Sequence, residues 1–150
     1  MATLKIAEEA IKTMQQDAEA AYPNECCGFI LGREVDERFV EEAFSAQNSK
    51  AGDRPRQFEI SPADYMKAER YAAEKGLSLL GVYHSHPDHP AYPSEHDLKQ
   101  AVPHFSYIIY SVQDGKINDV SCWRLNASGQ EFEQERIGRS GESETKRSPS

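Results

Sequence analysis

The chain has 150 residues, of which 38% are hydrophobic and 28% charged, enough for one domain with a hydrophobic core. Its net charge of −8 argues against a nucleic-acid partner and against binding to an anionic membrane. Three cysteines form no disulfide framework, the N-terminus lacks a signal peptide, and no apolar run reaches membrane-spanning length. We therefore expect a cytoplasmic protein, and the sequence leaves open whether it forms a homodimer.

The first third of the chain predicts one helix and two strands. Apolar residues recur at every third or fourth position from Leu4 to Ala21, which predicts an amphipathic helix. The apolar run Glu25–Gly32 predicts a buried strand, in which Cys26 and Cys27 are interpreted as small core residues rather than as a nucleophile or metal ligands. A strand over Arg38–Ala46 would pair with it as a hairpin.

The middle of the chain predicts a loop, a short strand and a second helix. Gln47–Arg56 is polar and basic, so its cations either face solvent or contact a carboxylate of a substrate. A short strand is expected over Phe58–Ile60. Ser61 then provides an N-cap for a helix over Pro62–Lys75, which Gly76 ends.

The last third predicts three strands and a tail. Ser106–Val112 contains no charged residue, which is typical of a strand in the centre of a sheet. Ile117–Leu125 and Glu131–Ile137 are predicted to form further strands. Because the segment from Gly138 onward has no apolar side chain, we expect one domain over residues 1–137 and a disordered tail over residues 138–150.

The residues with visible chemistry lie in one short region. Four of the five histidines fall between positions 84 and 96. His84 and His86 follow the apolar strand Leu77–Tyr83, and residues two apart on a strand share a face. Ser94 resembles the N-cap of a helix whose first turn would contain Asp97. Two imidazoles and one carboxylate form a three-ligand site that suits a catalytic zinc ion, with a fourth position for water.

The same residues have simpler interpretations. Ser94 and Asp97 also form an ordinary capping box at a helix start. Amide hydrolysis at a zinc ion needs a carboxylate that takes the proton of the attacking water, and Glu25 is a candidate. Periodicity alone does not select Glu25 over Glu74 or Glu95. Ser94 could donate a hydrogen bond to the developing oxyanion.

Together these residues resemble the JAMM (MPN+) metalloprotease motif. The motif is matched by Glu25, by the run His84-Ser85-His86-Pro87, by Ser94 and by Asp97. The resemblance implies that His84, His86 and Asp97 bind Zn²⁺, that Glu25 activates the water and that Ser94 stabilises the oxyanion. It also implies an α/β (α+β) fold of the cytidine-deaminase-like type, a curved, mixed and largely antiparallel sheet flanked by helices.

The resemblance further implies a substrate class. The chain is similar to small prokaryotic members of the family that are associated with sulfur-carrier proteins. We therefore expect a hydrolase that cleaves a peptide or isopeptide bond at the Gly-Gly tail of a ubiquitin-like (β-grasp) carrier and releases cysteine or a related amino acid. The alternatives are a deconjugating isopeptidase and a non-catalytic scaffold of the same fold. A metal-binding regulator that uses Cys26, Cys27 and His89 lacks a recognisable ligand spacing.

Overall fold

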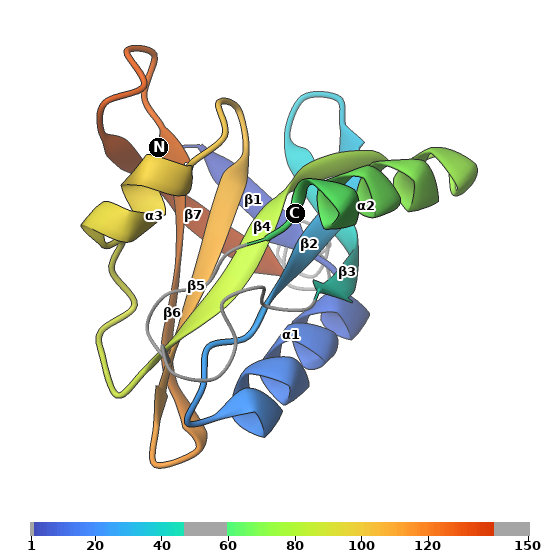
Figure 1. Ribbon diagram of the computed structural model, residues 1–150. Coiled ribbons are helices and arrows are strands. Elements are labelled where there is room, and N and C mark those ends of the chain that lie inside the picture. The colour runs from blue at the N-terminus through green and yellow to red at the C-terminus, as the bar shows by residue number, and fades with distance from the viewer. Residues whose placement is uncertain (1, 47–59, 140–150) are drawn as a thin grey trace, which may run out of the picture.

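The computed structural model describes residues 2–46 and 60–139. Within these ranges the chain forms seven strands and three helices (Figure 1). The strands are β1 (Thr3–Ile6), β2 (Cys27–Glu34), β3 (Arg38–Ala46), β4 (Ser78–Pro87), β5 (Ser106–Gln113), β6 (Lys116–Leu125) and β7 (Phe132–Arg139). The helices are α1 (Glu8–Ala21), α2 (Pro62–Glu74) and α3 (Glu95–Gln100).

The strands form one mixed sheet that closes on itself in the order β1-β3-β2-β4-β5-β6-β7. The pairs β2–β3, β2–β4, β5–β6 and β6–β7 are antiparallel. The pairs β1–β3, β1–β7 and β4–β5 are parallel. The expectation of a curved mixed sheet with flanking helices is therefore confirmed. Parallel strand pairs are more frequent than expected for a largely antiparallel sheet. In Figure 1, α1 lies on one side of the sheet, with α2 and α3 near its opposite end.

The prediction of a helix from Leu4 was wrong for its first residues. Thr3–Ile6 forms β1, which pairs with both β3 and β7, and the helix begins at Glu8. The reason is visible in the burial, because Leu4 and Ile6 are 0% and 1% exposed while Thr3 and Lys5 are only half-buried. A spacing of two between buried residues belongs to a strand.

The remaining elements follow the predictions with shifted ends. The strand over Arg38–Ala46 and the helix that Ser61 caps are confirmed. The strand predicted from Glu25 begins at Cys27, and the strand predicted to end at Tyr83 continues to Pro87. The predicted loop over Gln47–Arg56, most of the short strand over Phe58–Ile60 and residues 140–150 of the predicted tail lie outside the described residues. The predicted start of that tail at Gly138 was wrong, because Gly138 and Arg139 belong to β7.

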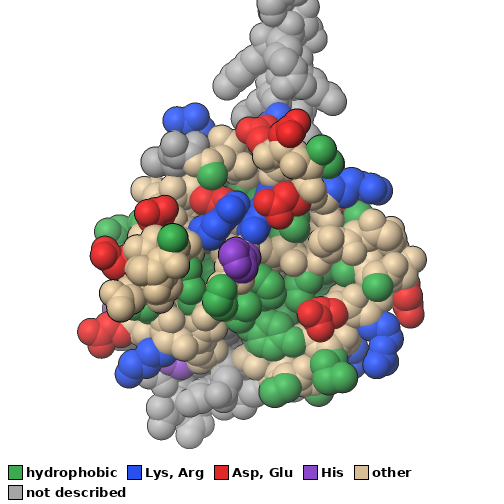
Figure 2. Space-filling model, turned by 90° about the horizontal axis from the view of Figure 1, so that it is seen from above, with side chains coloured by type: hydrophobic (Ala, Val, Ile, Leu, Met, Phe, Trp, Pro, Cys, Tyr) green, Lys and Arg blue, Asp and Glu red, His purple; other side chains and the backbone are tan. Residues whose placement is uncertain are grey.

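The two largest of three hydrophobic clusters among the described residues join helices to the closed sheet. The larger one joins α1 to the sheet through side chains such as Met14, Ile30 and Ile108. The smaller one lies near α2, and several of its hydrophobic side chains remain partly exposed. The face seen from above shows hydrophobic side chains gathered beside and below a central histidine, with basic and acidic side chains grouped just above it (Figure 2). None of the helices in the described ranges has the length and hydrophobicity that a membrane crossing requires.

The strand that carries the histidines is held between two neighbours. β4 pairs with β2 so that His84 lies opposite Cys27, and with β5 so that His84 lies opposite Ile109. At Gly81 the backbone of β5 comes so close that a Cβ atom would overlap the carbonyl oxygen of Ser106. Glycine at this position therefore permits the close β4–β5 contact that fixes the register leading into the histidines.

Candidate metal centre and pocket

His84 and His86 present their imidazoles on the same face of β4. Their ring centroids are 5.1 Å apart, and His84 is fully buried while His86 is 9% exposed. The strand continues through both residues to Pro87, so the alternation of a regular strand places the two rings side by side. The prediction that the two histidines share a face is confirmed by this arrangement.

Asp97 reaches the two imidazoles from the start of α3. Its Oδ1 atom lies 3.4 Å from Nε2 of His84, and its Oδ2 atom lies 3.2 Å from Nε2 of His86. The capping box is also present: Asp97 N–H donates to Ser94 Oγ (3.1 Å) and Ser94 N–H donates to Asp97 Oδ2 (2.8 Å). The cap fixes the direction of the carboxylate, so the structural and the chemical interpretations of this pair are compatible.

A backbone carbonyl orients the imidazole of His86. Nδ1 of His86 lies 2.9 Å from the carbonyl oxygen of Pro90, which can only accept a hydrogen bond. Nδ1 therefore carries a proton, and Nε2 is the atom turned toward Asp97. A hydrogen bond from the second ring nitrogen to a carbonyl is the usual way in which proteins fix a metal-binding histidine.

The environment favours neutral His84 and ionised Asp97. Burial lowers the pKa of His84 to about 4, against the opposing effect of the nearby Asp97 carboxylate. Burial alone would raise the pKa of Asp97, but His84, the contact with His86 and the backbone N–H of Ser94 hold it well below its usual range. For His86, burial favours the neutral ring, and the contacts with Asp97 and Pro90 outweigh burial and raise the pKa.

The three side chains fit a divalent metal ion. One donor atom from each of His84, His86 and Asp97 lies within 4.8 Å of the others, and all three residues are buried. Two imidazole nitrogens and a carboxylate oxygen are a donor set that zinc takes in catalytic sites, and His86 already has the outer hydrogen bond such a ligand needs. The group is the one candidate metal site among the described residues.

Glu25 is brought to the same site by hydrogen bonds between the segment before β2 and β4. Ser85, between the two histidines, accepts a hydrogen bond from Cys26 N–H at its Oγ (2.9 Å), and its own N–H donates to the Cys26 carbonyl (3.3 Å). Glu25, the preceding residue, is only 4% exposed. The pairing of β2 with β4 therefore supports the prediction that Glu25 lies next to the strand with the histidines.

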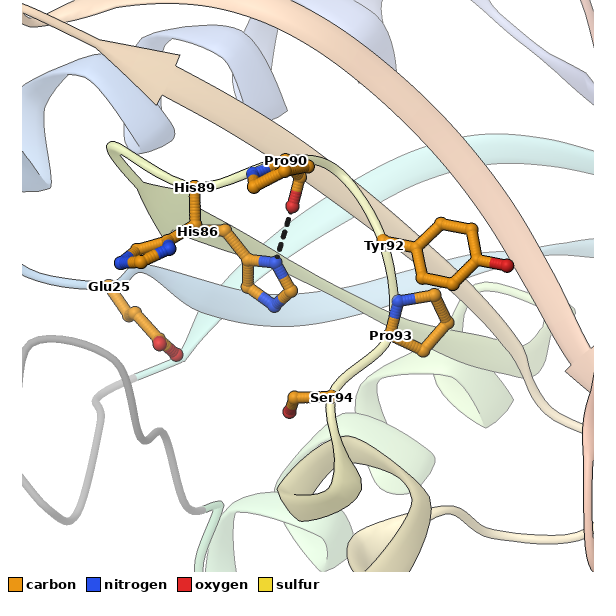
Figure 3. Close-up of a pocket in the computed structure, with 7 residues that line it drawn as sticks. All are labelled: Glu25, His86, His89, Pro90, Tyr92, Pro93 and Ser94. Atoms are coloured by element: carbon orange, nitrogen blue, oxygen red, sulfur yellow. Dashed lines mark hydrogen bonds between the residues drawn. The ribbon is translucent and has the colours of Figure 1, made fainter.

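Glu25 lines a pocket of about 290 Å³ beside the candidate metal site. Figure 3 shows Glu25 and His89 on one side of His86, while the ring of Tyr92 points away on the other side. Ser94 lies below His86 and Pro93 in the same view, at the start of α3. The full lining consists of Glu25, His86, His89, Pro90, Tyr92, Pro93 and Ser94.

The structure thus brings together all five residues named from the sequence, and it adds others that the sequence did not indicate. His89, Pro90 and Tyr92 enter through the connector between β4 and α3. The prolines of that connector were a signal for a defined loop, but not for the direction of each side chain. His96 pairs instead with Gln100, and His104 is exposed.

The sequence profile of the prokaryotic homologs of the JAB domain matches residues 7–126, most of the chain. The chain belongs to the JAB/MPN (JAMM) family of metallopeptidases. The five-residue signature and the geometry around His84, His86 and Asp97 agree with that membership.

Solved structures of similar proteins have the same fold. A protein from Salinibacter ruber is 40% identical, with a TM-score of 0.71 and a match over 90% of each chain. A protein from Desulfitobacterium hafniense is 31% identical, with a TM-score of 0.78 over 93% of each chain. A Jab1/MPN domain protein from Archaeoglobus fulgidus, 20% identical with a TM-score of 0.53, shares the fold.

The chain is also similar in sequence to proteins with several different names. The tail tip assembly protein K of Escherichia phage N15 is 33% identical over 93 residues, 62% of this chain and 34% of that protein. A probable TtuB-protein conjugate cleaving protease of Thermus thermophilus is 45% identical over 49 residues, 33% of each chain. The CysO-cysteine peptidase of Mycobacterium tuberculosis is 26% identical over 123 residues, 81% of this chain and 82% of that protein. The chain therefore spans about a third of the first two relatives.

Proposed function

We propose that this JAMM domain is a zinc-dependent hydrolase that cleaves a peptide or isopeptide bond at the C-terminal tail of a ubiquitin-like protein. The observation that carries the proposal is the convergence of His84, His86 and Asp97 beside a pocket that also contains Glu25. A structural metal site would have no use for an adjoining open pocket with a buried carboxylate in its wall.

His84, His86 and Asp97 would hold the metal ion. A bound zinc ion supplies Lewis acidity, which lowers the pKa of a water molecule to about 7 and polarises a carbonyl oxygen. The capping box and the Pro90 carbonyl keep Asp97 and His86 in their binding orientations before the ion arrives. A site organised in advance loses less free energy when it binds its ligand.

Glu25 is proposed as the general base and then the general acid. Its carboxylate would accept a proton from the attacking water and return that proton to the nitrogen that leaves. The side chain is almost fully buried at the pocket wall, so it acts in an environment where bulk water competes little for the proton. No other Glu or Asp lines this pocket within the described part of the chain.

Ser94 is proposed as the donor to the oxyanion. Its Oγ accepts a hydrogen bond from Asp97 N–H, and a hydroxyl that accepts one hydrogen bond still has its own proton to donate. Ser94 is exposed on the pocket lining, where a substrate carbonyl would lie. Donors aimed at the developing negative charge are among the strongest contributors to such reactions.

As the specific substrate we propose an adduct of a sulfur-carrier protein with a Gly-Gly tail, from which cysteine or a related amino acid is released. The similarity to the mycobacterial CysO-cysteine peptidase over 81% of this chain supports it. The second candidate is a deconjugase for ubiquitin-like modifiers. The similarity to the Thermus conjugate-cleaving protease, although confined to 49 residues, favours that candidate.

Parallel assays separate the two substrates. The zinc-loaded protein would be incubated with a carrier–cysteine adduct and with a carrier joined to a lysine ε-amine through an isopeptide bond. Mass spectrometry would identify the products of each reaction. We expect faster release of cysteine. Turnover of the isopeptide conjugate alone would reverse the order of the two proposals, and turnover of neither would leave the scaffold interpretation standing.

The catalytic role has its own test. Glu25→Gln is expected to keep zinc and to lose hydrolysis by at least about a hundredfold, the lower range for general acid–base catalysis. Glu74→Gln at the end of α2 makes the same chemical change away from the pocket and serves as the control. Equal activity of Glu25→Gln and Glu74→Gln would contradict the role of Glu25.

A further inference from the structure

A second pocket adjoins the one that contains Glu25. It has a volume of about 270 Å³ and shares Tyr92, Pro93 and Ser94 with the first pocket, so the two pockets adjoin at these residues. A cavity of this size is below the range of whole drug-sized ligands and suits one large side chain. Its lining consists of Tyr92, Pro93, Ser94, Glu95, Leu98, Trp123, Gln130, Glu131 and Phe132.

The apolar walls of this second pocket are fixed by contacts within the protein. Tyr92, 67% exposed, packs edge-on against Trp123 with ring centroids 5.0 Å apart and planes at 73°. The indole N–H of Trp123 donates to Ser121 Oγ (2.7 Å), and Phe132 packs edge-on against Tyr107. The cavity therefore keeps its shape without a ligand, and little ordering cost remains for binding.

The charged side chains found on the lining of the second pocket are both acidic. Glu95 and Glu131 are exposed carboxylates on its lining, and among residues 2–46 and 60–139 no lysine, arginine or histidine lines it. Apolar walls with carboxylates among them match a side chain that has a long aliphatic stem and a cationic end. An aromatic wall adds attraction for the same cation. An acidic side chain would meet two like charges there.

We propose that this second pocket is a subsite for a lysine or arginine side chain of the substrate, on the leaving-group side of the cleaved bond. The choice of side rests on the proposed function. Two glycines would precede the cleaved bond on the carrier side, and glycine has no side chain to fill an adjoining pocket. A side-chain pocket next to Ser94 therefore serves residues of the group that leaves. A single released cysteine would leave this pocket empty, and a peptide or protein leaving group, as in the second candidate function, would fill it.

The pocket can be tested by binding alone, because Trp123 is the one tryptophan of the chain. Tryptophan emission of the zinc-loaded Glu25→Gln protein would be followed during titration with N-acetyl-lysine amide, N-acetyl-arginine amide, N-acetyl-norleucine amide and N-acetyl-glutamate amide. We expect a saturable change with the two basic probes, a weaker one with norleucine and none with glutamate. Binding of norleucine as tight as that of lysine would overturn the proposal.

A pair of double variants separates local charge from net charge. Glu95→Gln with Glu131→Gln removes both carboxylates of the pocket and should weaken the basic probes about fivefold, as expected for a partly exposed ion pair. Glu74→Gln with Glu133→Gln changes the net charge equally at exposed positions outside the pocket and should leave binding unchanged. Equal effects of the two double variants would overturn the assignment.

A kinetic experiment tests the side of the cleaved bond. Carrier-tail substrates whose leaving dipeptide contains lysine or glutamate would be compared in the active protein. We expect KM about fivefold lower for the lysine substrate, with kcat little changed, and loss of the difference in the pocket double variant. Hydrolysis without discrimination or probe binding would reject the subsite. Probe binding without hydrolysis of any substrate would keep the subsite and reject the proposed function.

Discussion

Asp97 combines a structural and a chemical role in one carboxylate. Its Oδ2 atom accepts the N–H of Ser94 and also lies 3.2 Å from Nε2 of His86. The first contact belongs to any capping box, whereas burial beside two imidazoles does not. At this buried position one carboxylate therefore serves both the cap and the candidate metal site.

Asp97→Asn separates the two roles. The amide oxygen can still accept the N–H of Ser94, so the free energy of unfolding of the metal-free protein should change by less than about 1 kcal/mol. The charge that faces the imidazoles is lost, and zinc affinity should fall by at least about a hundredfold. Chelator competition and urea unfolding measure the two effects. A loss of stability with unchanged zinc affinity would contradict the proposed ligand role.

The three cysteines are predicted to be unreactive in the folded protein. Cys26, Cys27 and Cys122 are free thiols between 0% and 4% exposed. Burial raises the pKa of Cys27 to about 12 and also raises the pKa values of Cys26 and Cys122 well above the usual thiol range, so little thiolate exists at neutral pH. A thiol reagent such as Ellman's should label none within minutes, and all three in urea. Rapid labelling of the native protein would revive a chemical role for them.

At the scale of elements, the connector between β4 and α3 is attached to the sheet at several points. Ser111 Oγ donates to the carbonyl of His89, and Ser121 Oγ donates to the carbonyl of Ala91. The N–H of Asp88 donates to the carbonyl of Val112 (2.7 Å). These bonds hold the backbone on both sides of Pro90, whose carbonyl orients His86.

Ser121→Ala tests whether this attachment supports the metal site. The change leaves the carbonyl of Ala91 and the indole N–H of Trp123 without their partner, which should cost about 1–3 kcal/mol of stability. Because the Pro90 carbonyl then shifts more freely, zinc affinity should fall about tenfold. Ser128→Ala in the exposed turn before β7 is the control. Wild-type zinc affinity in Ser121→Ala would contradict a positioning role for the loop.

At the scale of the whole molecule, β1 closes the sheet. This four-residue strand lies between β3 and β7, so it joins an early segment of the chain to the last described strand. Its buried side chains, Leu4 and Ile6, extend the same hydrophobic cluster that packs against α1. The closed sheet places the β4 and β2 segments on a support that has no free strand edge among the described residues.

Leu4→Ala tests the closure. Leu4 is fully buried, and loss of its side chain should reduce the free energy of unfolding by about 2–5 kcal/mol, as for other large-to-small core substitutions. Val35→Ala, in the turn between β2 and β3 and 87% exposed, should change it by less than about 0.5 kcal/mol. Similar unfolding midpoints for the two variants would show that β1 is not part of the folded core.

Local patterns predicted much of the fold, and long-range pairing explains what they missed. The cap at Ser61 and the uncharged run over Ser106–Val112 located α2 and β5 because these signals lie within each element. Thr3–Ile6 was predicted as helix because four residues satisfy a strand period and a helical period equally well. Its partners β3 and β7 are distant in sequence, and only the closed sheet selects the strand.

The residues of the candidate site also differ in whether a local pattern or long-range pairing determines their position. The spacing of His84 and His86 and the capping box before Asp97 are local, so the sequence indicated three converging donors. Glu25 could be assigned only through the resemblance to a family, because its position beside the histidines depends on the pairing of β2 with β4. His89 and Tyr92 could not be assigned, since the direction of each side chain in a proline-rich connector depends on its attachment to β5 and β6.

The central claim is that two imidazoles and one carboxylate hold a single zinc ion next to Glu25. X-ray absorption at the zinc edge, on protein with its metal content measured, tests it most directly. We predict one zinc ion per chain with nitrogen and oxygen ligands at about 2.0–2.2 Å, two of them imidazoles, and no sulfur. A sulfur shell at about 2.3 Å, or failure to bind zinc stoichiometrically, would contradict the account.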